Sequence, residues 1–152
     1  MADLNQQIKD YLRNTKVMQL ATSVGNKPWA CNVHFYSDDK LNFYWISEPT
    51  RRHSTEIEQN QNVAAVVKIH EDTSAEPYVI GVSIEGKAEQ MSLEEAEKIE
   101  ALYVQKLGVP PVLFEDMKSG KNAHRFYRLT PSNIILFDTK NFPDNPRQEY
   151  KF

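Results

Sequence analysis

Residues 47–60 read SEPTRRHSTEIEQN and lie between two stretches of strand composition, residues 41–46 and 63–69. Thr50 is a residue type that caps helix N-termini, and Asn60 is one that ends helices in the left-handed conformation. We therefore predict a short helix between two strands, and the rest of the fold is worked out from this strand–helix–strand unit.

This predicted helix contributes little to a hydrophobic core, because Ile57 is its only large apolar side chain. It instead concentrates hydroxyls, two guanidiniums and an imidazole near the backbone N–H groups that a helix start leaves without partners. Arginine beside a helix N-terminus suits a phosphate dianion. Two interpretations stand at this point. One is a docking site for a phosphorylated cofactor, and the other is a solvated surface helix that tolerates basic residues in its first turn.

Composition argues against several classes of protein. The chain has 152 residues, and we expect residues 1–152 to form a single domain. Its formal net charge of −3 gives no electrostatic reason to expect a nucleic-acid partner. No apolar run is long enough to span a bilayer, no signal-peptide pattern opens the chain, and Cys31 is the only cysteine. A cytoplasmic protein is therefore expected. No metal site is predicted, because metal-ligand spacing is missing among His34, His53, His70 and His124.

Apolar periodicity predicts a mainly β chain. Helices are expected over residues 3–14 and 92–107, the second opened by a capping box at Ser92 and ended by Gly108. Strands are expected over residues 17–23, 29–36, 41–46, 63–69, 78–90, 123–130 and 133–138, the last two forming a hairpin around Pro131-Ser132. Many short strands with peripheral helices favour a small antiparallel barrel with helical additions. We expect a polar loop over 71–77 and a tail from Thr139 that is loose or packs on a partner subunit.

The strand over residues 29–36 has two unlike faces. Trp29, Cys31, Val33 and Phe35 share one of them, and Ala30, Asn32, His34 and Tyr36 share the other. This second face is half polar, which suits either solvent or the wall of a ligand site.

Three segments resemble the FMN-binding split-barrel family, the superfamily of pyridoxamine 5′-phosphate oxidase. They are Phe43-Tyr44-Trp45-Ile46-Ser47 followed by Arg52-His53 and Ile57-Glu58-Gln59-Asn60, then Gly86-Lys87-Ala88-Glu89, and finally Tyr127-Arg128-Leu129-Thr130-Pro131 followed by Ile134. They occur in the family's order and together span roughly residues 15–138.

The resemblance implies a six- to seven-stranded antiparallel split barrel with flanking helices, and a homodimer that holds FMN in clefts at the subunit interface. It assigns the FMN phosphate to Arg52 and His53 and places the Ser47 hydroxyl at the cofactor. Arg51 is interpreted as a solvated neighbour. The candidate cofactor-binding residues are Ile46, Ser47, Thr50, Arg52 and His53, with Trp29, Ala30, Cys31, Asn32, Val33 and His34 along the flavin ring.

The chain also departs from the oxidase. His53 stands where the family has lysine, Gly81 stands near a flavin-contacting glutamine, and the residues that hold the pyridoxal substrate have no match. We therefore predict an uncharacterised branch of the family and not the oxidase itself. The resemblance implies an FMN-dependent oxidoreductase with an unknown substrate, whose catalytic residues are unknown. The alternatives are a non-catalytic carrier of flavin, haem or deazaflavin, and a structural protein with a vestigial cleft.

Overall fold

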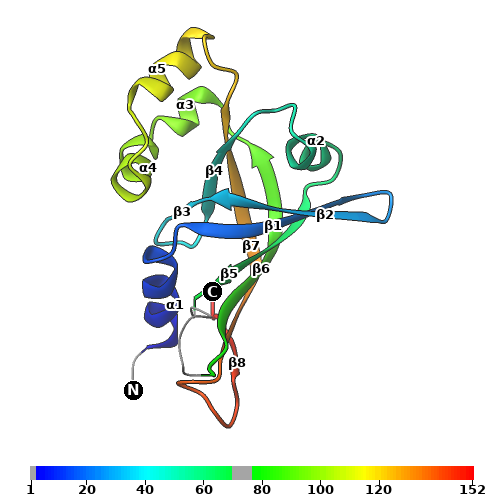
Figure 1. Cartoon of the computed structure of the whole chain (residues 1–152), viewed down its shortest axis with the longest axis vertical. Coiled ribbons are helices and arrows are strands. Elements are labelled where there is room, and N and C mark those ends of the chain that lie inside the picture. Colours follow the sequence, from blue (N-terminus) through cyan, green and yellow to red (C-terminus); the bar gives the residue numbers. More distant parts are fainter. Residues whose placement is uncertain (1–2, 70–76) are drawn as a thin grey trace.

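The computed structural model describes residues 3–69 and 77–152, which form one antiparallel sheet with helices around it (Figure 1). His70 and nearly all of the polar loop predicted over residues 71–77 lie outside the described residues.

Eight strands make up the sheet of the described residues. They are β1 Val17–Val24, β2 Lys27–His34, β3 Tyr36–Ser37, β4 Phe43–Ser47, β5 Asn62–Lys68, β6 Ile80–Gln90, β7 Arg125–Asp138 and β8 Arg147–Glu149. Their order across the sheet is β2-β1-β5-β6-β7-β4-β3, and β8 pairs with β7. Every pairing is antiparallel. The predicted mainly β, antiparallel class with flanking helices is therefore confirmed.

Five helices accompany the sheet in the described residues: α1 Leu4–Arg13, α2 Arg52–Gln59, α3 Leu93–Ala96, α4 Glu100–Leu107 and α5 Val112–Ser119. Figure 1 shows α3, α4 and α5 grouped at the end of the molecule opposite β8, with α1 beside the sheet. The single helix predicted over residues 92–107 is wrong, because tighter i to i+3 hydrogen bonds at Lys98 and Ile99 separate α3 from α4. The predicted cap at Ser92 and the left-handed end at Gly108 are both confirmed.

The hairpin predicted around Pro131-Ser132 is wrong as well, because β7 runs through it without a turn. Gly86 pairs with Pro131 while Glu85 pairs with Asn133, so Ser132 is the extra residue of a β-bulge. A Cβ on Gly86 would come within 2.2 Å of the Thr130 carbonyl oxygen. Glycine therefore permits the close backbone approach that lets one long strand bend here.

Two hydrophobic clusters hold these elements together. The larger lies between the sheet and α1, where Ile8, Leu12 and Trp45 are fully buried and Trp45 stacks on Tyr127 at 5.8 Å. The smaller joins α3, α4 and α5 to the sheet through Tyr103 and Phe126, whose rings meet edge to face at 5.1 Å. The second cluster fixes α4 against the end of β4, where the predicted cofactor site begins.

The C-terminal tail pairs with its own chain. Strand β8 adds to β7, and buried Asp138 accepts hydrogen bonds from the Tyr11 hydroxyl at 3.0 Å and from the Asn141 backbone N–H at 2.9 Å. The Asn5 side-chain amide donates to the Lys151 carbonyl at 3.0 Å, so the two ends of the described chain lie together. Among the helices of the described residues, none combines the length and apolar character needed to cross a bilayer.

Candidate functional site

The junction between β4 and α2 forms the centre of the candidate site. Phe43 and Trp45 are fully buried, and Ser47, which ends the strand, pairs with Arg125 of β7. The chain then turns, and α2 begins at Arg52 with Arg51 at the N-cap. The predicted cap at Thr50 is therefore wrong, and Asn60 ends the helix in an extended conformation, not in the predicted left-handed one. Among the described residues no side chain caps this helix start.

A hollow of about 290 Å³ opens beside this uncapped helix start, and we call it the α2 hollow. It is lined by Asn32, Val33 and His34 of β2, Ile46 and Ser47 of β4, Glu48, Arg51, His53, Tyr103 of α4 and His124. Four segments that are distant in the sequence thus meet at one place. Six of the candidate cofactor-binding residues lie in its wall.

Ser47 and His53 form the polar centre of the α2 hollow. The Ser47 Oγ and the His53 Nε2 lie 2.7 Å apart, which is a hydrogen bond. Burial and, secondarily, the positive charge of Arg51 lower the pKa of His53 from its ordinary value of 6.5. The imidazole is therefore neutral at physiological pH in the unliganded protein, and it gains a charge only when an anion favours protonation.

The two neighbouring arginines point to different places. Arg51 lines the α2 hollow, and its Nε lies 3.7 Å from an oxygen of Glu48. Arg52 instead donates to the Glu56 carboxylate at 2.9 Å and lies 4.3 Å from the centroid of the Trp29 ring. Thr22 also donates to Glu56, and these hydrogen bonds lower the pKa of that carboxyl. Arg51, interpreted as solvated, is 64% exposed and also lines the hollow, whereas Arg52, which the resemblance assigns to the phosphate, is not among the lining residues.

Strand β2 supplies the other wall of the hollow through its last three residues. The remaining candidates on this strand lie elsewhere. Trp29 is 40 % exposed beneath Arg52, Ala30 belongs to a second hollow on the outer face of the sheet, and Cys31 packs against the core. Burial raises the pKa of the Cys31 thiol, which disfavours the reactive thiolate form. Within the described sheet β2 is an end strand that pairs only with β1, so one edge of its backbone is open.

Sequence reasoning passed over four wall residues: Glu48, Arg51, Tyr103 and His124. The Nε2 of His124 lies 3.8 Å from Glu48, and its backbone N–H donates to Asn122 at 2.8 Å. Antiparallel pairing of the two aromatic strands is the signal that could have found His124, because it sets Arg125 opposite Ser47. His34, His53 and His124 share the hollow, yet no group of three or more potential metal ligands occurs among the described residues.

Comparison with protein families identifies the family of this chain. The sequence pattern of the family described as pyridoxamine 5′-phosphate oxidase matches residues 4–137, which includes every residue of the α2 hollow.

Individual relatives are distant in sequence and similar in fold. The UPF0306 protein PM1958 of Pasteurella multocida is 24% identical over 137 residues, covering 90% of this chain and 89% of that protein. The crystal structure of the heme storage protein HutZ from Vibrio cholerae has a TM-score of 0.67 and 17% identity, over 86% of this chain and 92% of that one. A FAD-binding protein from Mesorhizobium loti has a TM-score of 0.62 and 18% identity, over 85% and 88% of the two chains. At such identities the structures show a shared split-barrel fold and no more.

Proposed function

The chain belongs to the pyridoxamine 5′-phosphate oxidase family, and on that premise we propose that it binds FMN with the phosphate in the α2 hollow. The observation that carries this proposal is the uncapped start of α2 meeting the Ser47–His53 pair and the Arg51 guanidinium in one hollow. A phosphate dianion accepts hydrogen bonds from each of these groups.

The donor set fits a phosphate better than it fits a solvated surface. A helix start attracts anions through its free N–H groups, and an uncapped start leaves these groups to a ligand. Within the described residues the charge of Arg51 has Glu48 as its ion-pair partner, at 3.7 Å, which is a loose contact. We propose that Arg51 contributes the first guanidinium and that Arg52 contributes a second one after leaving Glu56. Ile46 and Thr50 complete the phosphate end of the proposed site.

The unpaired backbone edge of β2 supports the proposed position of the flavin ring. Backbone N–H and C=O groups on an unpaired edge can pair with the polar edge of a flavin. We propose that residues 29–34 follow the ring, with Asn32, Val33 and His34 already at the hollow. A bound flavin supplies hydride or electron transfer, and the protein supplies its position and electrostatic surroundings. The proposed function is therefore a flavin-dependent oxidoreductase with an unknown substrate.

We propose that the cofactor lies at the interface of a homodimer. The outer face of the sheet supports this, because a second hollow of about 440 Å³ there is lined largely by small and apolar residues, including Ala21, Ala64 and Val66, with Gln19, Glu85 and Asn133 as its polar members. Val66, one of its lining residues, is 41% exposed and lies in a strand whose alternate residues face outward. Light scattering should give twice the chain mass, and Val66→Glu should give a monomer. A monomeric wild-type protein would contradict this part of the proposal.

A second candidate is a carrier that binds haem or flavin without catalysis. The specific observation in its favour is that three imidazoles, those of His34, His53 and His124, line the α2 hollow. Histidine is a common axial ligand of haem iron. Absorbance spectra separate the two candidates, because protein-bound haem gives an intense band near the violet and flavin gives two weaker bands.

Titration with FMN followed by dialysis tests the proposed function. We expect quenched flavin fluorescence and retained flavin absorbance in the wild type, and loss of both in the double variant Ser47→Ala/His53→Ala. Lys27→Gln, on an exposed strand start outside the hollow, is the matched control and should retain FMN. Oxidation of a nicotinamide by the loaded protein would favour the enzyme over the carrier. Wild-type protein that retains no added FMN would refute the proposal.

A further inference from the structure

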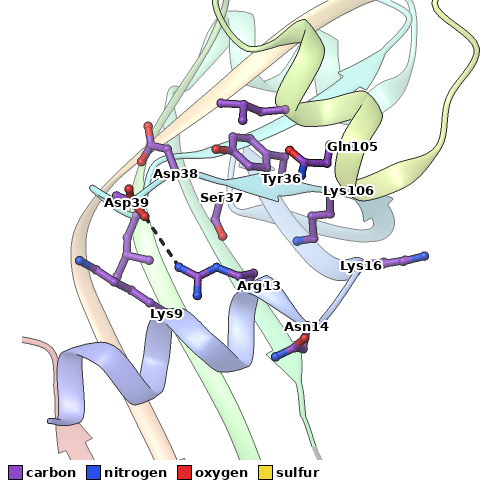
Figure 2. Close-up of a pocket in the computed structure, with 12 residues that line it drawn as sticks. Lys9, Arg13, Asn14, Lys16, Tyr36, Ser37, Asp38, Asp39, Gln105 and Lys106 are labelled. Carbon is purple, nitrogen blue, oxygen red and sulfur yellow. Dashed lines mark ion pairs between the residues drawn. The ribbon is translucent and has the colours of Figure 1, made fainter.

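A second pocket lies between α1, α4 and the β3–β4 turn, and its volume is about 460 Å³. Figure 2 shows its wall, which we call the α1–α4 pocket. It is lined by Lys9, Arg13, Asn14 and Lys16 near α1, Tyr36, Ser37, Asp38, Asp39 and Leu41 of the turn, and Leu102, Gln105 and Lys106 of α4. It shares no lining residue with the α2 hollow. Pockets of this size hold small molecules in other proteins.

Positive charges exceed negative charges in this pocket. Four cationic residues and two acidic residues line it, and the Asp38 carboxylate is occupied by hydrogen bonds within its own turn. The Asp38 carboxylate accepts from the backbone N–H groups of Lys40 and Asn42 at 3.0 and 2.9 Å and from the Tyr44 hydroxyl at 2.8 Å. The side chain of Asp39 is 92% exposed and lies 3.9 Å from the Arg13 Nη2, while Asp10, which is outside the wall, pairs with the Arg13 Nη1 at 3.0 Å and leaves the Nη2 side of the guanidinium toward the pocket. The wall therefore carries positive charge that its own carboxylates do not neutralise.

Lys106 is the clearest case of a cation without a counterion. Its Nζ donates to the Leu12 carbonyl at 3.0 Å and lies 3.8 Å from the centroid of the Phe35 ring. Within the described residues it forms no ion pair with a carboxylate. Burial first and the nearby charge of Lys16 second lower its pKa to about 8. A half-buried ammonium that lacks an anion is unfavourable, and an anionic ligand would relieve that cost.

Uncharged groups complete the wall. The Ser37 hydroxyl and the Gln105 amide form no side-chain hydrogen bond within the described chain, so both have capacity for a ligand. In Figure 2, Arg13, Ser37 and the amino end of Lys106 border one common space, while Lys16 extends away from it. The Tyr36 ring, Leu41 and Leu102 add apolar surface, and Leu102 is 43% exposed.

We propose that the α1–α4 pocket binds a small organic acid, with its carboxylate at Arg13 and Lys106 and its apolar body against Tyr36 and Leu102. Arginine can pair with both oxygens of a carboxylate, and the lysine adds a single point charge. Inorganic phosphate offers the charge without the apolar body, so the geometry favours a carboxylate that carries a ring or a branched chain.

Isothermal titration with benzoate as the probe tests this proposal, with benzamide as its neutral counterpart. We expect saturable binding of benzoate, weakened about tenfold by Arg13→Gln and by Lys106→Met, and no binding of benzamide. Lys27→Gln, whose charge lies outside the pocket, should bind benzoate like the wild type. Because Arg13 is exposed, Arg13→Gln should fold normally. It therefore tests the proposal even if Lys106→Met does not fold.

Shifts of backbone amide signals in nuclear magnetic resonance spectra show where benzoate binds. We expect benzoate to shift the amide signals of Ser37 and Gln105, with those of His53 and Arg51 unchanged. Failure of benzoate to bind at about 10 mM, equal binding of benzamide, unchanged affinity in Arg13→Gln, or shifts confined to the α2 hollow would each overturn the proposal. Preference for inorganic phosphate over benzoate would overturn it too. No flavin is added, so the result is independent of the proposed FMN site.

Discussion

The α2 hollow and the α1–α4 pocket both combine basic side chains with helix α4, yet they hold their charge differently. In the α2 hollow the central imidazole of His53 is neutral and bonded to Ser47, and the guanidinium in the wall, that of Arg51, lies 3.7 Å from Glu48. In the α1–α4 pocket Lys106 is an ammonium with a carbonyl and an aromatic ring as its neighbours. His53 gains its charge when an anion favours protonation, whereas Lys106 already carries one.

This difference predicts how ligand affinity and protein stability respond to pH at each site. A neutral imidazole costs the unliganded fold little, but the ligand must then bring about its protonation. A half-buried ammonium costs the unliganded fold stability and is ready for an anion. Affinity in the α2 hollow should therefore depend on pH, and stability should depend on pH through the α1–α4 pocket. Four predictions test or refine this contrast.

Arg51→Ala should produce the largest effect. It removes the one guanidinium that already lines the α2 hollow, and a charged hydrogen bond of this kind is worth about 2 kcal/mol, or about thirtyfold in the dissociation constant of FMN. Fluorescence titration at fixed ionic strength measures it. Arg13→Gln is the control from the other pocket and should leave FMN affinity unchanged. Equal losses in the two variants would mean that general charge attracts FMN, and the contrast between the sites would fail.

FMN affinity should fall as pH rises, because burial and Arg51 lower the pKa of His53 and the bound phosphate raises it. Binding then takes up a proton, and the affinity lost between about pH 6.5 and 8.5 should approach tenfold. His53→Lys restores the charge that the family carries at this position, so its affinity should vary by less than about twofold over the same range. Titrations at several pH values measure both. Parallel slopes for wild type and His53→Lys would assign the pH dependence to FMN itself.

Much of the fold could be predicted from the sequence, since alternating apolar residues identify strands such as β1, β5 and β6 without knowledge of their partners. The errors came from residues that are compatible with two different local structures. Pro131-Ser132 is typical of a turn, but Gly86 on the neighbouring strand lets the same residues form a bulge. The preference of Pro131-Ser132 for a turn is a local property of these residues. Whether they form a turn or a bulge depends on the neighbouring strand, which is about 45 residues away in the sequence.

The candidate site was predicted less completely, for a geometric reason. Successive residues at a helix start point about 100° apart, so Arg51 and Arg52 cannot be distinguished unless the rotation of α2 is known. Contacts of Arg52 with Trp29 and of Glu56 with Arg52 and Thr22 set that rotation, and they join β2, α2 and β1. His124 was missed for the related reason that the register between β4 and β7 brings it to Glu48. Ser47 and His53 were proposed together from the family resemblance, and the structure brings their side chains to 2.7 Å in the hollow.

Lys106 should make the free energy of unfolding depend on pH. Its pKa is about 8 in the folded protein against an ordinary 10.5, so between these values the unfolded chain holds a proton that the folded chain lacks, and stability rises with pH. The groups that face it are Lys9, Arg13, Lys16, Tyr36, Asp38 and Asp39. From pH 7 to 9 the wild type should gain about 1 kcal/mol relative to Lys106→Met in urea unfolding, and saturating benzoate should abolish that gain. Identical pH profiles would show that Lys106 has an ordinary pKa.

Arg52→Ala should have the smallest effect, about threefold in FMN affinity, because the proposed contact requires its guanidinium to give up Glu56 and the Trp29 ring first. Glu56→Gln separates the contribution of the Arg52–FMN contact from the cost of breaking the Arg52–Glu56 ion pair. It weakens the ion pair and keeps Arg52, so FMN affinity should rise slightly. Thr22 still bonds the residue at 56, which keeps the helix packed on β1. If Arg52→Ala lost more affinity than Arg51→Ala, Arg52 would be the principal phosphate ligand that the resemblance implies, and the arrangement seen here would be that of the unliganded site.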